Sequence, residues 1–225
     1  MRKMLSIKHL RKGIVGIEAA IVLIAFVIIA AALAYVVVNT GFFASQKSKD
    51  TIMRGISEAA SSLQLDGSVI GYVNETTNNE SAVIALVLPL KISIGREGVD
   101  VSNYSLVVTV WITGSNTSVY MPDIYNGTTE EAKIGFDAAN LTDTIINITK
   151  SANETSVAYM GIVNSDGDRL LESNEKGFLI IYLGSNTAKE YDKVKIEVKA
   201  PIGASLIVER EIPAGLMPNQ VIDLG

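Results

Sequence analysis

Apolar positions follow two different periods along this chain of 225 residues. Residues 19–38 form a run of twenty apolar side chains that contains no charge. Beyond residue 43, apolar side chains recur every three or four positions, at Ile52, Ile56, Ala59 or Ala60, and Leu63, with charged residues between them. No proline occurs before Pro89. Together these patterns predict one helix from about Ile14 to about residue 65, roughly 75 Å long at 1.5 Å per residue.

After Asp66-Gly67 the period changes to two. Residues 193–199 alternate charged with aliphatic side chains, as a half-buried strand does. Five further segments have the length and composition of strands, and turns rich in Gly, Asn, Asp and Ser separate them: residues 83–88, 104–112, 157–163, 178–183 and 206–212. We therefore predict an α+β chain, with a helical segment over residues 14–66 and an all-β, immunoglobulin-like sandwich or barrel over residues 67–225.

The first thirteen residues have a different character from the rest. They hold five basic groups and no acid, and they stand directly before the apolar segment. A run of twenty apolar residues can span the ~30 Å hydrocarbon core of a bilayer. Basic residues stay on the cytoplasmic side of a membrane, so the run would cross outward. The far side of the run reads Asn39-Thr40-Gly41, which is a poor match to the small-residue cleavage site of an ordinary secretory signal.

The near side of the run carries a more specific motif. Arg11-Lys12-Gly13, then Ile14-Val15-Gly16-Ile17-Glu18, then the apolar run, resembles the class III leader of type IV pilins and archaeal flagellins (archaellins). The resemblance implies that a membrane leader peptidase removes residues 1–13 by cutting between Gly13 and Ile14. The recognition positions that it implies are Arg11, Lys12 and Gly16. An uncleaved membrane anchor is the alternative interpretation.

Glu18 argues against a simple anchor, because a carboxylate beside an apolar span is costly in lipid. In the family that the motif resembles, this residue would be the fifth of the mature chain. Its carboxylate would neutralise the new α-amino group of a neighbouring subunit during assembly.

The resemblance is strongest over about residues 11–73, including 41–47 and 66–69, and it favours an archaellin over an adhesive pilin. It implies an extracellular filament subunit of the archaeal flagellum (archaellum), used for swimming, whose precursor sits in the cytoplasmic membrane. Its implied partners are further copies of itself or sister archaellins, the leader peptidase, and the export and motor platform. An adhesive type IV pilin and a membrane-anchored surface glycoprotein are the alternative functions.

The amino-acid composition excludes several kinds of functional site. The chain has no cysteine, which excludes disulfides and thiolate sites, and its only histidine, His9, lies in the leader. Removing the leader lowers Lys+Arg from 19 to 14 against 24 acids, which leaves a net charge of −10. A chain this acidic repels nucleic acid. We therefore expect neither an enzyme nor a nucleic-acid-binding protein.

The β segment is rich in Asn-x-Ser/Thr sequons, the acceptor sequence for N-linked glycans on exported proteins. Eight of the fourteen asparagines stand in this motif, and none of the eight lies in the predicted helix. Such a distribution is expected if the helix is buried in a filament and the β domain faces outward. The sequons are Asn74, Asn79, Asn103, Asn116, Asn126, Asn140, Asn147 and Asn153.

One acidic loop, residues 164–175, has oxygen-bearing side chains at a spacing near that of a calcium loop. Arg169 stands where an EF-hand needs glycine, and the flanking segments are strands, so this is no EF-hand. Similar loops in archaellins can hold a divalent ion, and that resemblance makes a structural Ca²⁺ or Mg²⁺ a possible cofactor. Its candidate ligands are Asp166, Asp168 and Glu172. The alternative is a solvated hairpin turn.

Overall fold

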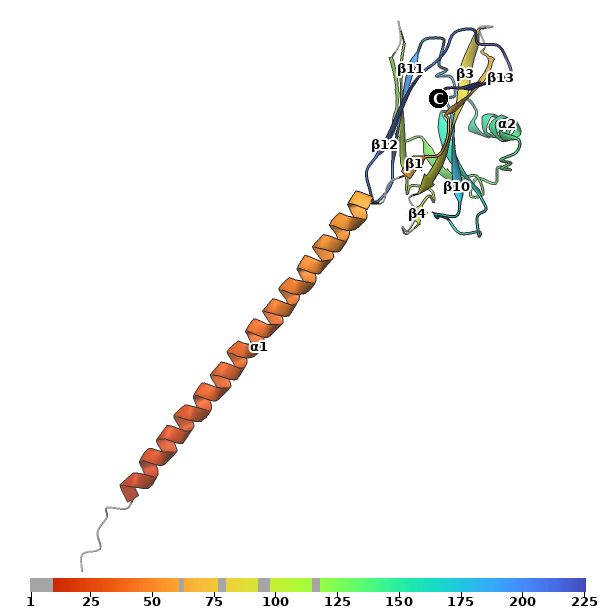
Figure 1. Cartoon of the computed structure of the whole chain (residues 1–225). Helices are drawn as coiled ribbons and strands as arrows, with labels where there is room; N and C mark the ends of the chain where they lie inside the picture. The colour runs from red at the N-terminus through yellow and green to blue at the C-terminus, as the bar shows by residue number, and fades with distance from the viewer. Residues whose placement is uncertain (1–9, 61–62, 77–79, 93–97, 115–117) are drawn as a thin grey trace, which may run out of the picture. The chain divides into compact units, whose positions relative to one another are not determined.

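The computed structural model describes residues 10–60, 63–76, 80–92, 98–114 and 118–225. The chain divides into two compact units, residues 1–54 and residues 55–225. The first unit consists of the helix α1 (Leu10–Ala60), whose last turn passes into the second unit. Figure 1 draws α1 as one uninterrupted ribbon. Its hydroxyl side chains bond back to the preceding turn: Thr40 Oγ1 donates to the carbonyl of Val36 at 2.7 Å, and Thr51 Oγ1 to that of Lys47 at 2.9 Å.

The second unit is built on two open sheets. A seven-stranded sheet runs in the order β13-β2-β3-β10-β8-β7, with β1 also paired to β3. Its strands are β1 (Leu63–Leu65), β2 (Ile70–Glu75), β3 (Ser81–Ile92), β7 (Tyr125–Thr128), β8 (Val157–Val163), β10 (Lys176–Tyr182) and β13 (Gln220–Asp223). A four-stranded sheet runs in the order β12-β11-β5-β6. Its strands are β5 (Val107–Thr113), β6 (Ser118–Met121), β11 (Lys193–Lys199) and β12 (Leu206–Glu211).

Two smaller elements complete the domain. The short pair β4 (Val99–Asp100) and β9 (Leu170–Leu171) forms a separate ribbon, and the helix α2 (Leu141–Ala152) connects β7 to β8. That connection contains a helix because β7 and β8 pair in parallel, and parallel neighbours need a crossover. Every other strand pair is antiparallel in the described part of the chain.

The main core lies between the two sheets. Alternate residues of β11 point inward, so Val194, Ile196 and Val198 are buried while the intervening charged residues face out. They belong to the same apolar cluster as Leu86 and Leu88 of β3. The predicted α+β organisation is therefore confirmed. Because neither sheet closes on itself, the domain is a sandwich and not a barrel.

The helix α2 covers the other face of the seven-stranded sheet (Figure 1). Ile145 and Ile148 pack in a second apolar cluster with Val87 of β3 and Ile180 of β10. The strands β3 and β10 are thus buried on both faces, which explains why residues 83–88 and 178–183 are continuous apolar runs without alternation. The prediction of an all-β domain missed this helix.

The predicted helix end is also wrong. The structure ends α1 at Ala60, and residues 63–65 form β1, in which Leu63 pairs with Ile92 and Leu65 with Leu90. Leu63 continues the spacing of Ile52 and Ile56, yet its side chain is 3% exposed in the sandwich core. Burial in the domain therefore overrides the helical pattern, and the β unit begins before residue 67. At the other end, the helical backbone begins at Leu10, four residues before Ile14.

A carboxylate directly after β1 makes two ion pairs. Asp66 lies 2.6 Å from the ammonium of Lys176 and 2.8 Å from that of Lys91. The hydrogen bond from Lys176 and then that from Lys91 lower the pKa of Asp66 from 3.8 to about 2. The three residues tie the segment after β1 to β3 and to the first residue of β10.

We expect replacement of Ile148 by Ala to destabilise the sandwich. The side chain is fully buried between α2 and the sheet, so its loss leaves a cavity that costs about 2–5 kcal/mol. Ile146→Ala is the matched control, because Ile146 is 37% exposed on the same helix. Urea unfolding of the full chain in mild detergent can be followed by the fluorescence of Trp111, the only tryptophan. Equal losses in the two variants would contradict the packing described.

We expect the Asp66 ion pairs to add stability that acid removes. A carboxyl whose folded-state pKa is depressed stabilises the fold above its unfolded pKa, and loses that effect as pH falls from 3.8 toward 2. Asp66→Asn should therefore lower the melting temperature slightly at pH 7 and make no difference near pH 2. Glu75→Gln, which removes an exposed carboxylate outside these pairs, is the control. A pH-independent difference between Asp66→Asn and the parent would contradict this account.

Candidate assembly helix and modification sites

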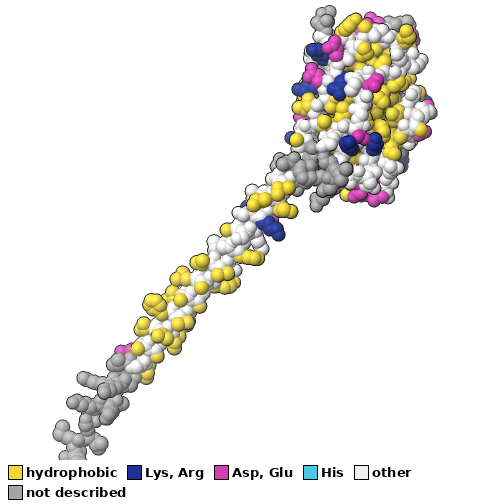
Figure 2. Space-filling model, viewed as in Figure 1, with side chains coloured by type: hydrophobic (Ala, Val, Ile, Leu, Met, Phe, Trp, Pro, Cys, Tyr) yellow, Lys and Arg dark blue, Asp and Glu magenta, His cyan; other side chains and the backbone are white. Residues whose placement is uncertain are grey.

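The helix α1 exposes an apolar surface along most of its length. Every described side chain from Gly16 to Ile56 is exposed, including nineteen large hydrophobic ones such as Phe26, Val27 and Val38. Figure 2 shows hydrophobic side chains along the helix on the face in view. A helix that is apolar all round its circumference is stable only when lipid or protein surrounds it.

By length and composition, α1 meets the criteria for a membrane-crossing helix. Residues Gly16–Ile56 include an 18-residue window with a mean hydropathy of 3.2, none of it buried within the chain. A bilayer core needs about 20 helical residues, whereas α1 has 51. A membrane can therefore cover the apolar run, but the rest of the helix extends past it.

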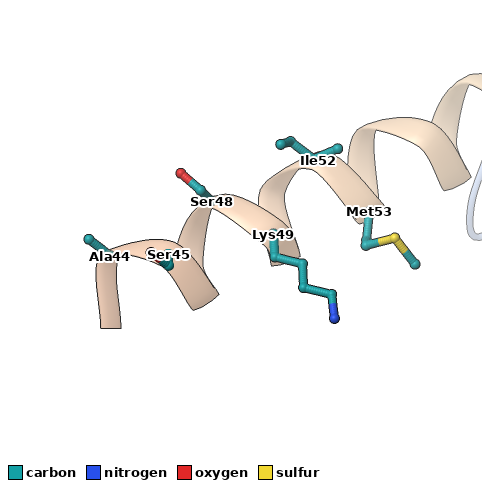
Figure 3. A pocket seen from close by; sticks show the side chains of 6 residues that line it. All are labelled: Ala44, Ser45, Ser48, Lys49, Ile52 and Met53. Carbon is teal, nitrogen blue, oxygen red and sulfur yellow. The ribbon is translucent and has the colours of Figure 1, made fainter. Parts of the chain in front are cut away.

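The amphipathic part of α1 follows the apolar run. Figure 3 shows six of its side chains, which border a shallow depression: Ala44, Ser45, Ser48, Lys49, Ile52 and Met53. A second depression lies farther toward the N-terminus, between Glu18 and Ala30. Only residues of α1 line either depression. Both are open grooves between side chains of a single helix, a shape that suits another helix better than a small ligand.

The predicted cleavage motif lies at the start of this helix. Arg11, Lys12, Gly13 and Ile14 have helical backbone, and their side chains fall outside the description. Gly16 is exposed, and a side chain added there would meet no atom within 4 Å.

Glu18 lies one turn after the predicted cleavage point. Its carboxylate is exposed and has no ion pair within the described parts of the chain. An unpaired carboxylate next to an apolar run is available for a partner from outside the chain.

Six of the eight predicted sequons lie in described parts of the β unit. Asn126, Asn140, Asn147 and Asn153 are exposed, and Asn74 and Asn103 are half-buried. The remaining two, Asn79 and Asn116, lie outside the described residues. Three of the exposed ones belong to α2: Asn140 precedes the helix, Asn147 lies within it and Asn153 follows it.

The acidic loop between β8 and β10 uses its carboxylates to bind its own backbone. Asp166 Oδ1 accepts the N–H of Asp168 at 3.1 Å, and Asp168 Oδ1 accepts the N–H of Leu170 at 2.8 Å. Glu175, which is 3% exposed, accepts the N–H groups of Asp166 at 3.3 Å and Glu172 at 3.0 Å. The loop is thus a chain of turns folded around a buried glutamate.

The three predicted metal ligands are not brought together by this arrangement. Among the described residues, no group of three or more His, Cys, Asp or Glu side chains is placed to hold a metal ion. The metal site at Asp166, Asp168 and Glu172 stays a prediction. Sequence reasoning recognised the acidic loop but not the role of Glu175 as its organising residue.

A second organising carboxylate has no signal in the sequence. Glu131 Oε2 accepts the N–H groups of Asn103 at 3.0 Å and Thr128 at 3.1 Å, while its Oε1 lies 3.1 Å from Arg169. Two of these partners are 28 and 38 residues away along the chain, so only the folded structure reveals the cluster. Arg169, which excluded an EF-hand, is thus a structural ion-pair partner.

These features define a class of protein. A long helix with an uncovered apolar surface, joined to a β sandwich that closes its own core, is the organisation of a subunit that polymerises through its helix.

Comparison with known proteins identifies the family within that class. The model of the archaeal-type flagellin family matches residues 13–210. The chain is 45% identical over 217 residues to "Probable flagellin 1" of Aeropyrum pernix, an alignment that covers 96% of this chain and 98% of that protein. A "Probable flagellin 1" of Archaeoglobus fulgidus is 31% identical over 216 residues, with 94% and 95% covered.

Solved structures agree with this fold. The archaeal flagellum of Methanospirillum hungatei strain JF1 superposes with a TM-score of 0.56 at 26% identity, and covers 89% of this chain and 94% of that one. The crystal structure of archaeal flagellin FlaB1 from Methanocaldococcus jannaschii gives a TM-score of 0.52 at 18% identity, with 73% and 97% covered. The chain belongs to the archaeal-type flagellin family, and it is a structural subunit of the archaeal flagellum filament.

Proposed function

We propose that this chain is made as a membrane-inserted precursor, is cut between Gly13 and Ile14, and then polymerises through α1 into a swimming filament. The observation that carries this proposal is the complete exposure of an apolar helix that exceeds the length of a bilayer. The membrane covers the apolar run before assembly, and neighbouring copies of α1 cover it afterwards. The family match begins at residue 13, which is consistent with a mature chain starting at residue 14.

Cleavage after Gly13 creates a charged α-amino group that needs a partner of opposite charge, and Glu18 can be that partner. The new α-amino group of Ile14 is positively charged and would enter an apolar helical core. Glu18 is the only carboxylate among residues 14–49. Pairing it with the α-amino group of a neighbouring copy neutralises both charges and sets the axial register of one helix against the next. The side-chain exposure of Glu18 in the single chain supports this role.

The remaining partners follow from the same route. A leader peptidase acts on Gly13, an export and motor platform withdraws and rotates the filament, and sister flagellins are possible copolymer partners. The β unit forms the outer surface and carries glycans on its sequons, none of which lies on α1. The chain itself performs a mechanical role and no catalysis.

We expect extracellular filaments to contain a chain that starts at Ile14. Gly13→Val places a branched side chain at the scissile bond, so it should block cleavage and leave the uncut precursor in the membrane. Ser6→Ala, elsewhere in the leader, is the control and should assemble normally. N-terminal sequencing and intact mass of filaments and membranes measure the outcome. Assembled filaments whose subunits retain Met1 would refute the proposed route.

We expect Glu18→Gln to be cut normally but to assemble poorly. The substitution leaves the α-amino group unpaired in an apolar core, and losing one partner of a buried ion pair costs about 3–5 kcal/mol. Asp50→Asn, an exposed carboxylate on the same helix, is the matched control. Cleavage is scored by mass and assembly by the yield of sedimentable filaments. A Glu18→Gln chain that assembles like the Asp50→Asn control would remove this residue from the mechanism.

A further inference from the structure

The sequon at the end of α2 has an unusual backbone. Asn153 caps the helix with φ 47° and ψ 53°, and Glu154 follows with φ 67°, so two successive residues adopt the left-handed conformation. Asparagine tolerates this conformation better than most residues, and helices often end in it. The Asn153-Glu154-Thr155 sequon therefore forms a tight turn away from the helix axis.

Contacts from a neighbouring loop hold this turn in place. Ser185 donates its N–H to the carbonyl of Glu154 at 3.1 Å, and Thr155 donates to that of Ala152 at 3.0 Å. Gly184 approaches so closely that a Cβ there would lie 2.2 Å from the carbonyl oxygen of Glu154. The loop after β10 thus fixes the turn, and the turn presents its side chains in a fixed geometry.

Both side chains that define this sequon are free. Asn153 and Thr155 are exposed, and within the described residues neither side chain makes a hydrogen bond. N-glycosylation forms a bond at the amide nitrogen Nδ2 and requires the hydroxyl two residues later. A free Nδ2 and a free hydroxyl on a rigid, exposed turn satisfy both requirements in the folded protein.

The sequon on β7 is blocked by its own fold. Asn126 Nδ2 donates to the hydroxyl of Tyr159 at 2.8 Å. Thr128 is 4% exposed, and its Oγ1 accepts the N–H of Glu131 at 3.2 Å. Asn103 is similarly enclosed, since its Oδ1 is buried without a partner in the described chain and the Ser105 hydroxyl lies 2.7 Å from that of Ser102.

In the two other sequons of α2, helical geometry restrains Asn147 and a side-chain hydrogen bond restrains Asn140. Residues two apart on a helix point about 200° from each other, so Asn147 and Thr149 cannot face one enzyme pocket together. The Thr149 hydroxyl also donates to the carbonyl of Ile145 at 2.9 Å. Asn140 Nδ2 donates to Asp143 at 2.6 Å. In the sequon at the end of β2, the Thr76 hydroxyl donates to the carbonyl of Glu80 at 3.0 Å.

A polar cleft of about 760 Å³ lies directly beside the Asn153 turn. Residues 120–126, 151–152, 154–157 and 185–186 contribute to its walls, and Tyr159 lines it from β8, whereas Asn153 itself stands between two lining residues without being one of them. Among the described residues, the charged ones that line it are Asp123 and Glu154, so it disfavours anionic ligands. Hydroxyl and amide groups supply the rest of its polarity, and Tyr120, which is 58% exposed, offers a ring face.

The polar side chains of the cleft are already ordered. Asn186 Nδ2 donates to Ser156 Oγ at 3.3 Å, and Ser156 donates to the carbonyl of Leu183 at 2.7 Å. The amide oxygens of Asn126 and Asn186 remain without a donor among the described residues, and each can accept hydroxyl groups. A neutral, hydroxyl-rich ligand that stacks one ring face fits this set of groups.

We propose that, of the six sequons in the described parts of the β unit, Asn153 is the one that the folded chain presents for glycosylation, and that the attached neutral sugar lies in the adjacent cleft. This proposal rests on glycosylation of the chain, as proposed above. The donor is a sugar linked through its anomeric carbon to a lipid phosphate. The bond from that carbon to the phosphate oxygen breaks, the phosphate leaves with the electron pair, and the carbon bonds to Nδ2 of Asn153, which releases one proton.

The first experiment tests which sequon the folded chain can use. Full-length chain made in a host without the transferase is folded in mild detergent, then incubated with archaeal membranes that contain transferase and glycosyl donor. We expect peptide mass spectrometry to find sugar at Asn153 at least tenfold more often than at Asn126 or Asn147. Urea-unfolded chain should lose this preference. Thr155→Ala should abolish the modification and Thr155→Ser should restore it.

Each outcome of that experiment has one meaning. Sugar on folded chain at another of the six described sequons, instead of Asn153 or as often as at Asn153, would overturn the inference and leave the proposed function intact. Sugar at no sequon, in folded chain, unfolded chain or native filaments, would overturn glycosylation itself. Neither result bears on cleavage at Gly13, which is measured separately.

The second experiment tests where the attached sugar lies. We compare amide hydrogen exchange of native glycosylated chain with that of Thr155→Ala, which removes the sugar and keeps the backbone of Asn153. Residues 122–126 and 183–186 should exchange several-fold faster in Thr155→Ala. Asn147→Gln, on the outer face of α2, is the control and should match the parent. Unchanged exchange in Thr155→Ala would overturn the placement of the attached sugar in the cleft.

Discussion

The apolar surface of α1 must be removed from water, and this requirement restricts the chain to surroundings that cover the helix. Nineteen large hydrophobic side chains of α1 are exposed in the single chain. Burying one such side chain is worth about 1.5–3 kcal/mol, so covering the helix is worth on the order of tens of kcal/mol. No intrachain contact supplies this burial among the described side chains of α1. The helix therefore needs an apolar surrounding from outside the chain, and in the filament other copies of α1 can supply it; the route proposed above adds a membrane as the surrounding before assembly.

The β unit, unlike α1, buries its apolar side chains within its own core. The seven-stranded sheet is covered by the four-stranded sheet on one face and by α2 on the other, so β3 and β10 are buried on both sides. This closure explains how one chain combines an insoluble helix with a domain that faces water. The unit's carboxylates contribute to its rigidity, since Glu131 and Glu175 each hold distant backbone N–H groups together. A domain built in this way keeps its shape whether its helix lies in lipid or in a filament.

The period of the apolar residues predicted an element correctly wherever the local pattern agrees with the burial of those residues in the folded structure. It identified α1, the alternating strand β11 and the bounds of β8, and the resemblance of its first residues identified the family.

The sequence predictions failed where contacts between distant residues decide the structure. The segment of α2 is rich in Ile, Thr and Asn, which do not favour helix, and its helix depends on packing of Ile145 and Ile148 against β3 and β10. Leu63 fits a helical spacing but pairs with Ile92, 29 residues later. For the acidic loop, the sequence showed which residue types are present but not that their carboxylates accept backbone N–H groups.

When helices of several copies pack together, their acidic β units are brought close enough to repel one another. Without its leader each chain carries a net charge of −10, and packing helices side by side brings many such units together. Repulsion between surface charges is screened over about 8 Å at physiological ionic strength, so it acts mainly between neighbouring copies. Two carboxylates form ion pairs within the chain: Asp66 with Lys91 and Lys176, and Glu131 with Arg169. Others accept backbone N–H groups. These contacts use carboxylates to hold the fold but leave the net charge of −10 unchanged, so the apolar gain from α1 has to outweigh the screened repulsion between neighbouring copies. In the proposed assembly, the helix therefore decides whether the chain polymerises, while the charged surface of the β unit favours solubility.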